Sequence, residues 1–352
     1  INPGPGGSFL RSFAKLGDHL YFRADDGDGG DELWRTDGTK AGTERVKNIR
    51  PGPDGSSPAD LTKLGRHLYF AAYDGDFDRE LWRTDGTKDG TKRVKDINPG
   101  DGGSSPGGFA KLGRRHLYFA AARSGLDREL WRTDGTAAGT KLVKNISPGA
   151  DGSSPSGFAK LSERLYFQAS VGSTNDELWR TDGTAAGTKL VKDIDPGGGS
   201  ELRDLTKLGS HLYFGADDSL SDDELWRTDG TEAGTERVKD IYPGPDGSFP
   251  ADFVKLGTQL YFRAGDDIFG SELWRTDGTE AGTELTKDID PGPDSGRPCN
   301  KLRLGDHIYF SAGESGEDGK GLELWRSDGS ESGTKRVKDI NPGAGSSLPF
   351  CG

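Results

Sequence analysis

Short runs of alternating apolar and polar residues recur along the whole chain, without the 3.6-residue period of an amphipathic helix. Residues 60–64 read Asp-Leu-Thr-Lys-Leu, residues 67–72 read His-Leu-Tyr-Phe-Ala-Ala, and the pair Gly65-Arg66 separates them. A Gly-X pair between two such runs is typical of a tight hairpin. A polar loop, the run Glu80 to Arg83, an Asp-Gly turn and a last apolar run over 92–97 complete the unit. The pattern predicts four short antiparallel strands.

The whole unit is copied seven times. All seven tryptophans lie in the phrase Glu-Leu-Trp-Arg-Thr/Ser-Asp-Gly, 47 to 51 residues apart, at Trp34, Trp82, Trp131, Trp179, Trp226, Trp274 and Trp325. A period of this length marks an array in which each copy buries its faces against its neighbours. Four antiparallel strands per copy predict an all-β, seven-bladed β-propeller, and the tight hairpins disfavour a solenoid of parallel coils.

Linkers rich in Pro, Gly and Ser separate the copies. They predict one propeller over residues 1–352, with its blades at approximately 11–50, 59–98, 107–147, 156–195, 203–242, 251–290 and 299–341, and with a C-terminal seam tail at 342–352.

The third and fourth strands of a blade can be registered by hypothesis. Pairing Thr36 with Thr43 places Glu32 opposite Lys47, and this Glu and this Lys occur in all seven copies. Opposite charges across a strand pair contribute roughly 0.2–1 kcal/mol. We therefore predict that each blade carries this cross-strand ion pair.

The phrase Glu32-Leu33-Trp34-Arg35-Thr36-Asp37-Gly38-Thr39, followed by Gly42-Thr43 and Val46-Lys47, resembles the ELWxxDGT repeat of bacterial surface and secreted proteins. All seven copies match the phrase closely, and the last departs in having Ser327 and Ser330 in place of Thr. The resemblance implies an extracellular propeller-like repeat protein without an assigned reaction. The Asp-Gly-Thr turn also resembles the Asp-box turn of sialidase-type propellers, where it is a folding element remote from the active site.

The charge balance limits the partners. The 352 residues contain 46 Lys plus Arg against 58 Asp plus Glu, which gives a formal net charge of −12. Such a field opposes binding to nucleic acid and to anionic membrane surfaces. No apolar stretch approaches the ~20 residues of a transmembrane helix. The chain starts at Ile1 and contains no Met, so we expect a processed end and a secreted or cell-surface protein.

The sequence predicts no enzyme. The five histidines, His19, His67, His116, His211 and His307, all follow the first hairpin turn, where two copies carry Arg164 and Gln259 instead. A position that tolerates Arg and Gln is neither a shared metal ligand nor a shared general base. No copy has a unique His, Cys or Ser with a catalytic partner. A pair of carboxylates in the central channel stays open as an alternative.

The loop between the second and third strands varies most, and several copies of it are acidic. Its carboxylates could supply the oxygen ligands that Ca²⁺ takes, although no loop has EF-hand spacing and solvated turns are the alternative. The candidate ligands are Asp25, Asp26, Asp28, Asp31, Asp74, Asp76, Asp78, Asp217 and Asp218. No other cofactor is expected.

The same loops carry apolar residues that break the pattern, namely Phe77, Leu126, Leu220, Ile268 and Phe269. Such side chains on one face mark a contact surface for a glycan or an extracellular protein, or else are ordinary scattered surface residues.

Only two cysteines occur, Cys299 and Cys351. Counted from the preceding Pro-Gly, each falls at the start of an inner strand, so we predict a disulfide that ties the C-terminal tail across the seam.

These features together predict a non-enzymatic, secreted or cell-surface binding or scaffold module. One alternative is a multivalent lectin with seven equivalent pockets at the Asp-Gly-Thr turns. A third reading is a self-assembling extracellular subunit. It rests on the surplus segment at residues 1–4, which copies residues 340–343.

Overall fold

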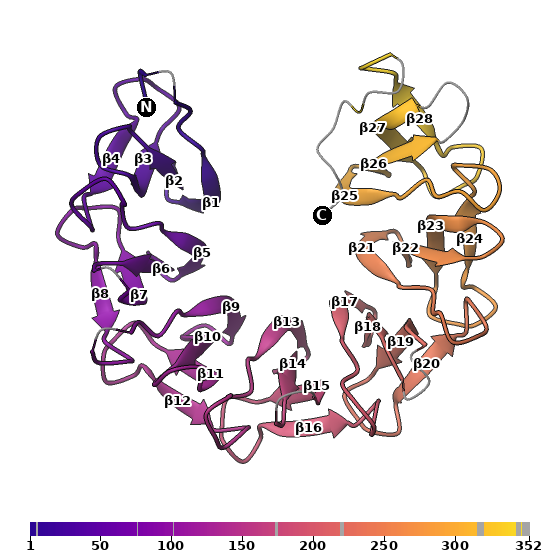
Figure 1. Cartoon of the computed structure of the whole chain (residues 1–352), viewed down its shortest axis with the longest axis horizontal. Coiled ribbons are helices and arrows are strands. Elements are labelled where there is room, and N and C mark those ends of the chain that lie inside the picture. The colour runs from indigo at the N-terminus through magenta and orange to yellow at the C-terminus, as the bar shows by residue number, and fades with distance from the viewer. Residues whose placement is uncertain are drawn as a thin grey trace. The chain divides into compact units, whose positions relative to one another are not determined.

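The computed structural model forms seven four-stranded antiparallel sheets, and the described residues contain no helix (Figure 1). The structure describes residues 1–352 except 5, 76, 101, 173–174, 219–221, 315–319, 343–345 and 347–352, and it leaves out the side chain of Lys320. Each sheet contains four strands that are consecutive in the sequence. The chain is therefore a seven-bladed β-propeller, which confirms the predicted fold class.

Each blade contains four strands that follow one another in sequence and in space. The first three blades contain β1 (Arg11–Leu16), β2 (His19–Asp25), β3 (Asp31–Thr36), β4 (Glu44–Lys47); β5 (Ala59–Leu64), β6 (His67–Tyr73), β7 (Arg79–Thr84), β8 (Lys92–Lys95); and β9 (Gly107–Leu112), β10 (His116–Ala122), β11 (Arg128–Thr133), β12 (Lys141–Lys144). The fourth and fifth contain β13 (Ser156–Leu161), β14 (Arg164–Ser170), β15 (Asp176–Thr181), β16 (Lys189–Lys192); and β17 (Arg203–Leu208), β18 (His211–Ala216), β19 (Glu224–Thr228), β20 (Thr235–Lys239). The last two contain β21 (Ala251–Leu256), β22 (Gln259–Asp266), β23 (Gly270–Thr276), β24 (Glu284–Lys287); and β25 (Cys299–Leu304), β26 (His307–Glu314), β27 (Lys320–Ser327), β28 (Lys335–Lys338).

The chain divides into two compact units. The first contains residues 1–174 and 181–189, and the second contains residues 175–180 and 190–352. In the first unit the first strands β1, β5, β9 and β13 follow one another side by side, and in the second unit β17, β21 and β25 do so (Figure 1).

The hydrophobic cores lie between consecutive blades. Leu64, Tyr69 and Leu81 of the second blade pack in one cluster with Phe119 and Trp131 of the third. The first and second blades form an equivalent cluster, and so do the fifth and sixth blades. Each sheet therefore buries one face against the next copy, as the repeat period predicts.

Polar contacts join the same neighbours. The Arg83 guanidinium donates to the carbonyl oxygen of Gly135 at 2.7 Å, and Lys95 Nζ donates to that of Thr140 at 2.8 Å. The Lys95 ammonium also lies 5.9 Å from the centre of the Trp131 ring. Equivalent arginines reach the next blade in both units, for example from Arg35 to Gly86 and from Arg227 to Gly278. The repeated motif thus supplies both donors and acceptors of the contact between blades.

The observed register corrects the predicted ion pair. Trp34 does lie opposite Arg45, but a bulge follows and Leu33 pairs with Lys47. The bulge adds one residue to β4, so Lys47 lies opposite Leu33 and on the other face of the sheet from Glu32. Glu32 keeps the inward side that its regular pairing with Ala24 of β2 gives it. The predicted Glu32–Lys47 pair is wrong, because Lys47 Nζ donates to the Thr91 carbonyl oxygen of the next blade.

The inward glutamate holds the linker that follows its own blade. The carboxylate of Glu32 is buried and accepts hydrogen bonds from the backbone N–H groups of Ile49 and Arg50, both at 2.9 Å, and from Ser56 Oγ at 2.6 Å. The other copies of this glutamate are buried in the same way, namely Glu80, Glu129, Glu177, Glu224, Glu272 and Glu323. Burial raises the pKa of Glu272 to about 8, against the lowering effect of its hydrogen bonds.

The Asp-Gly-Thr turn is closed by its own side chains. Asp85 Oδ1 accepts from the backbone N–H of Thr87 at 2.9 Å and from its hydroxyl at 2.7 Å, and Thr87 Oγ1 accepts from Gly90 N–H at 2.9 Å. These bonds hold the pKa of Asp85 below its usual value. The turn aspartate therefore has a structural role in stabilising the turn.

We expect the substitution Gly135→Ala to destabilise the protein more than Gly65→Ala. Both glycines have positive φ, 92° and 60°, where an added side chain costs roughly 1–2 kcal/mol. A Cβ at Gly135 would also overlap the hydroxyl of Tyr69 in the preceding blade, whereas a Cβ at Gly65 meets no atom within 4 Å. Urea unfolding measures both, and Tyr69→Phe should restore part of the loss at Gly135. Equal losses for the two glycines would contradict the proposed overlap.

We expect the free energy of unfolding to fall as the pH rises from about 4.5 towards 8. The pKa of Glu272 is higher in the folded protein than its ordinary value of 4.5, so folding takes up a proton in this window. The substitution Glu272→Gln removes this titration and should make the slope of stability against pH shallower. The exposed Glu280 lies on the turn after β23, so Glu280→Gln is the control. Urea midpoints at pH 5 and pH 8 test this, and an unchanged slope in Glu272→Gln would refute it.

Candidate functional site

The first strand of every blade carries a β-bulge at its second residue. In β5, Ala59 pairs with Ala71 but Thr62 pairs with Tyr69, which leaves one extra residue in β5. The second residue adopts a left-handed conformation in each strand, with φ of 56° at Ser12, 59° at Asp60, 67° at Gly108, 64° at Gly157, 54° at Asp204, 58° at Asp252 and 55° at Asn300. Bulges redirect side chains and occur often next to functional sites. Five of these seven positions carry a residue other than Gly despite the strain of a positive φ. Such strain often accompanies a functional site, so the edge formed by the first strands is a candidate site.

In the first unit the bulged strands enclose a pocket of about 410 Å³. It is lined by Ser12, Phe13, Asp60, Leu61, Thr62, Gly108, Phe109 and Phe158, from β1, β5, β9 and β13. Gly108 opens it, because a Cβ there would lie 3.4 Å from the Phe158 ring. The rings of Phe109 and Phe158 are fixed by Phe119 and Phe167, at centroid distances of 5.3 and 5.1 Å. Rigid aromatic walls thus lie beside the Asp60 carboxylate.

The same edge of the second unit carries charges. Asp204 Oδ2 accepts from the backbone N–H of Asp252 at 2.6 Å, and Asp252 Oδ2 accepts from Lys301 Nζ at 3.0 Å. Lys301 stands where every other copy has Phe or Leu, and its side chain is fully buried. Burial lowers its pKa to about 8, although Asp252 favours the charged form. The sequence analysis missed Lys301, which an alignment of the seven first strands would have revealed.

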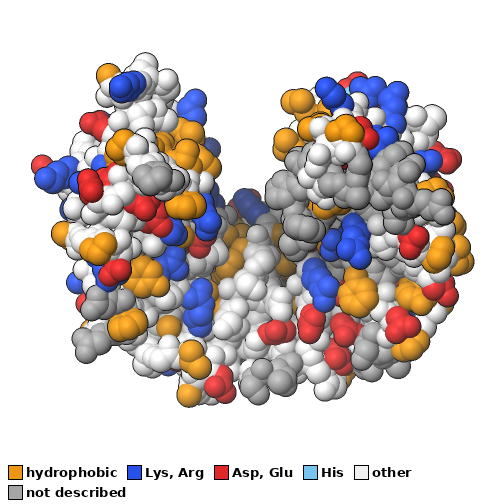
Figure 2. Space-filling model, turned by 45° about the horizontal axis from the view of Figure 1, so that its top comes forward, with side chains coloured by type: hydrophobic (Ala, Val, Ile, Leu, Met, Phe, Trp, Pro, Cys, Tyr) orange, Lys and Arg blue, Asp and Glu red, His pale blue; other side chains and the backbone are white. Residues whose placement is uncertain are grey.

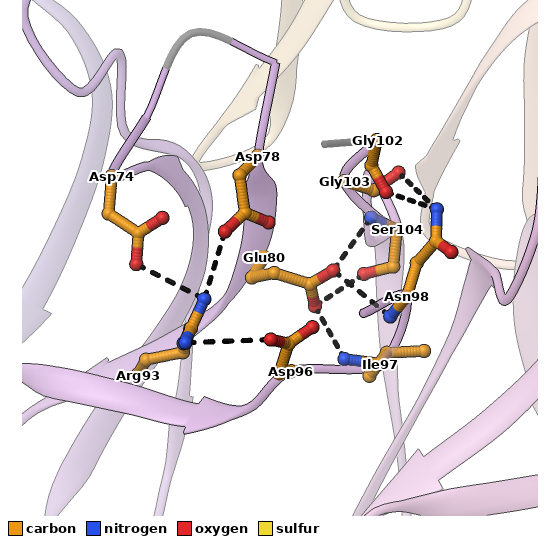
Figure 3. Close-up of polar contacts among 10 residues, drawn as sticks. All are labelled: Asp74, Asp78, Glu80, Arg93, Asp96, Ile97, Asn98, Gly102, Gly103 and Ser104. Carbon is orange, nitrogen blue, oxygen red and sulfur yellow. Dashed lines mark hydrogen bonds and ion pairs between the residues drawn. The ribbon is translucent and has the colours of Figure 1, made fainter. Parts of the chain in front are cut away.

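A cluster of carboxylates surrounds Arg93 in the second blade (Figure 3). The guanidinium lies 3.4 Å from Asp74, 2.9 Å from Asp78 and 3.6 Å from Asp96. Burial, followed by the neighbouring Asp74, raises the pKa of Asp78 to about 6. Glu80 lies next to this cluster, but its oxygens accept from Ile97, Asn98 and Ser104, as Figure 3 also shows. The arginine therefore occupies the place between the three aspartates.

The fifth blade repeats this arrangement. Arg237 lies 2.7 Å from Asp222, 3.5 Å from Asp240 and 3.9 Å from Asp218. Glu224 again accepts hydrogen bonds from its linker. Two blades thus bring together one arginine and three aspartates from the variable loop and the end of the fourth strand.

The predicted calcium ligands lie in three separate loops. In the first blade Asp31 pairs with Arg23, Asp26 pairs with Arg45 at 3.0 Å, and Asp25 accepts from the backbone N–H of Gly27. Asp28 is exposed. Of the remaining candidates, Asp74 and Asp78 meet at Arg93, Asp217 and Asp218 lie beside the fifth-blade cluster, and Asp76 is outside the described residues.

Three of the predicted contact residues are exposed. Phe77 is 76 % exposed, and Leu126 and Ile268 are also largely exposed, whereas Phe269 is half-buried and Leu220 lies outside the described residues. The sequence analysis missed Phe13, which is 54 % exposed at the pocket. On the face shown in Figure 2, apolar side chains lie scattered among charged ones of both signs. The loop residues therefore do not by themselves define a binding surface.

Each histidine lies beside a tyrosine of its own strand. All five histidine rings lie 6.3 to 6.4 Å from the ring of the tyrosine two positions later. Cys299 is buried at the start of β25, and Cys351 lies outside the described residues, so the disulfide stays a prediction. Within the described part of the chain, no helix has the length and apolar character of a membrane span.

The fold is similar to the propeller domains of peptidases. Prolyl oligopeptidase B from Galerina marginata, bound to a 35-residue hydrolysis and macrocyclization substrate, matches with a TM-score of 0.57 and 13 % identity over 94 % of this chain and 50 % of its own. A puromycin-hydrolyzing peptidase of Mycobacterium tuberculosis matches with a TM-score of 0.51 and 13 % identity over 99 % and 56 %, and a prolyl endopeptidase with 0.53 and 15 % over 93 % and 48 %. The chain thus spans about half the length of these proteins. No family model and no curated protein sequence matches it.

These comparisons correct the predicted function. We expected a non-enzymatic binding or scaffold module, with a lectin or a self-assembling subunit as alternatives, but the similar solved structures include prolyl oligopeptidases and puromycin-hydrolyzing enzymes. That expectation was wrong because the repeat symmetry shows only how the blades are built, and an enzyme can contain such a propeller as one of its parts. The narrower prediction that this chain carries no catalytic residues of its own stays a prediction.

Proposed function

We propose that this propeller binds an extended polypeptide at the first-strand pocket, as the substrate-binding part of a peptidase-type protein. The observation that carries the proposal is the pocket of about 410 Å³ between β1, β5, β9 and β13. Pockets for small ligands usually measure roughly 300–1,000 Å³ and combine apolar walls with a few polar groups. This pocket is large enough for one or two side chains of a peptide.

The chemistry of the lining fits a peptide. Phe13, Phe109 and Phe158 offer apolar surface for an aromatic or proline side chain, and Asp60 offers an acceptor for an N–H group or a cation. The first strand of each sheet has a hydrogen-bonded neighbour on one side only. The other side of an edge strand presents backbone groups that an extended peptide can bond.

The similarity to peptidases supports the choice of a polypeptide over other ligands. Because the chain corresponds to about half of each of those proteins, we assign bond cleavage to a further domain or a separate chain. Following the resemblance to ELWxxDGT repeats, we propose that the protein acts outside the cell.

The test is fluorescence anisotropy with a fluorescein-labelled peptide, Gly-Phe-Pro-Lys-Phe-Gly. We expect saturable binding that Phe13→Ala weakens about tenfold or more, because an apolar side chain contributes roughly 1.5–3 kcal/mol when it is buried. The substitution Asp60→Asn should weaken binding of this peptide but not of a version with Ala in place of Lys.

Phe77→Ala is the matched control, because Phe77 is equally aromatic but lies on the loop between β6 and β7. It should bind the peptide as the unmodified protein does. Equal affinities for the Phe13 and Phe77 variants, or no saturable binding, would refute the proposed site. Mass spectrometry should find the peptide intact after incubation with the propeller alone. Cleavage would place catalytic residues within this chain.

A further inference from the structure

The fifth blade differs from the second at two positions beside its arginine-centred cluster. In the second blade Tyr73 lies opposite Arg79, and the guanidinium is 5.7 Å from the centre of the tyrosine ring. In the fifth blade Asp217 takes the place of Tyr73, and Asp223 takes the place of Arg79. An anion thus replaces a cation, and a second anion replaces a neutral ring. The region is therefore more negative by three charges.

Several carboxylate oxygens in this region are buried without a hydrogen-bond partner. Asp222 and Asp223 are each only 3 % exposed. Among the described residues, Oδ1 of Asp217, Asp222 and Asp240 and both oxygens of Asp223 accept no hydrogen bond. The nearest cation to Asp223 is Arg203, whose guanidinium lies 3.3 Å from Oδ2. Burying carboxylate oxygens without partners costs free energy. A cation bound beside them would offset this cost.

The geometry of three of these acidic side chains suits a cation. One carboxylate oxygen each from Asp222, Glu224 and Asp240 lie within 4.8 Å of one another. Arg237 contacts Oδ2 of Asp222 and of Asp240, so their unpartnered Oδ1 atoms are available to a second cation while the arginine stays in place. A carboxylate oxygen has two lone pairs. Glu224 Oε1 uses one of them to accept from Tyr242 N–H at 2.9 Å, so its second lone pair can bind the cation.

We propose that Asp222, Glu224 and Asp240 bind a divalent cation of the Ca²⁺ type in the fifth blade. A set of carboxylate oxygens favours hard cations such as Ca²⁺ and Mg²⁺ over metals that prefer nitrogen or sulfur. The site lies away from the first-strand pocket in sequence and belongs to the second unit. It is independent of the proposed peptide binding.

Other blades provide internal comparisons. The third blade has Leu142 and Asn145 where the fifth has Arg237 and Asp240, so it lacks two members of the cluster. The second blade keeps all of them, but the side chain of Asp78 is 23 % exposed and Arg79 takes the place of Asp223. Asp78 Oδ1 and Asp96 Oδ1 also lack hydrogen-bond partners among the described residues, but the second blade has a cation and a neutral ring where the fifth blade has two aspartates. We therefore expect its affinity for a divalent cation to be lower.

Terbium luminescence tests the site, with Tb³⁺ as a probe for Ca²⁺ and Trp226 of β19 as the excited donor. We expect saturable emission that Ca²⁺ displaces with a dissociation constant on the order of 10⁻⁴ M. Mg²⁺ should displace it less well, because it demands a stricter octahedral arrangement. The substitutions Asp222→Asn and Asp240→Asn should each weaken Ca²⁺ binding at least about tenfold, since affinity follows the number of charged ligands.

Asp78→Asn in the second blade is the matched control and should leave the titration unchanged. Arg237→Leu, which copies the residue of the fourth blade, should tighten Ca²⁺ binding because it removes a competing cation. A merely structural arginine would not have this effect. Circular dichroism verifies folding, and the half-exposed Asp240 serves as the test position if Asp222→Asn does not fold. No displacement by 10 mM Ca²⁺ (about a hundred times the expected constant), or equal losses in the Asp78 and Asp222 variants, would overturn the assignment.

Discussion

The carboxylate before each Leu-Trp pair connects the interior of a blade to the linker that follows it. Glu80, for example, accepts hydrogen bonds from the backbone of Ile97, Asn98 and Ser104 while it is fully buried. The linker has no sheet partners for these N–H groups, and an unsatisfied buried donor costs roughly 1–3 kcal/mol. Because the linker leads to the first strand of the next blade, the position of the carboxylate fixes where that strand begins. The core between blades and the contacts of Arg83 and Lys95 with the next copy depend on this placement.

The sequence predicted the strands, their number and their antiparallel order, because the alternation of residues and the turn chemistry act locally. It failed at Glu32, where strict alternation placed a charged residue opposite Lys47. A single extra residue in β4 moved Lys47 to the other face of the sheet, and sequence periodicity carries no sign of such a bulge. The serine 24 residues later was the available signal, since Ser56 Oγ bonds the carboxylate. Gly296 holds the equivalent place in the sixth blade and bonds through its N–H instead.

The candidate sites were harder to predict because they depend on departures from the repeat. The acidic loops were visible in the sequence. Only the folded chain shows that Asp222 lies close to Asp240, eighteen residues later, and that Asp31 is instead paired with Arg23. The aromatic pocket requires Gly108 to lack a side chain between two bulged strands, and the bulges are not evident in the sequence. Lys301 and Asp223 could have been found by comparing copies position by position. The likeness to peptidases establishes the architecture, and the chemistry of these unequal positions has to supply the function.

The repeated arginine and lysine bonds between blades run in one direction along the chain. The first six copies donate through an arginine and the first five through a lysine to the following copy. The acceptors are the carbonyl oxygens of its Asp-Gly turn and of the threonine at the start of its fourth strand. A copy inserted between two others, or removed from between them, leaves the same kind of junction behind. Duplication of whole units therefore needs no new interface to be invented. Each added copy can therefore change its variable loop while it keeps the same contacts with its neighbours.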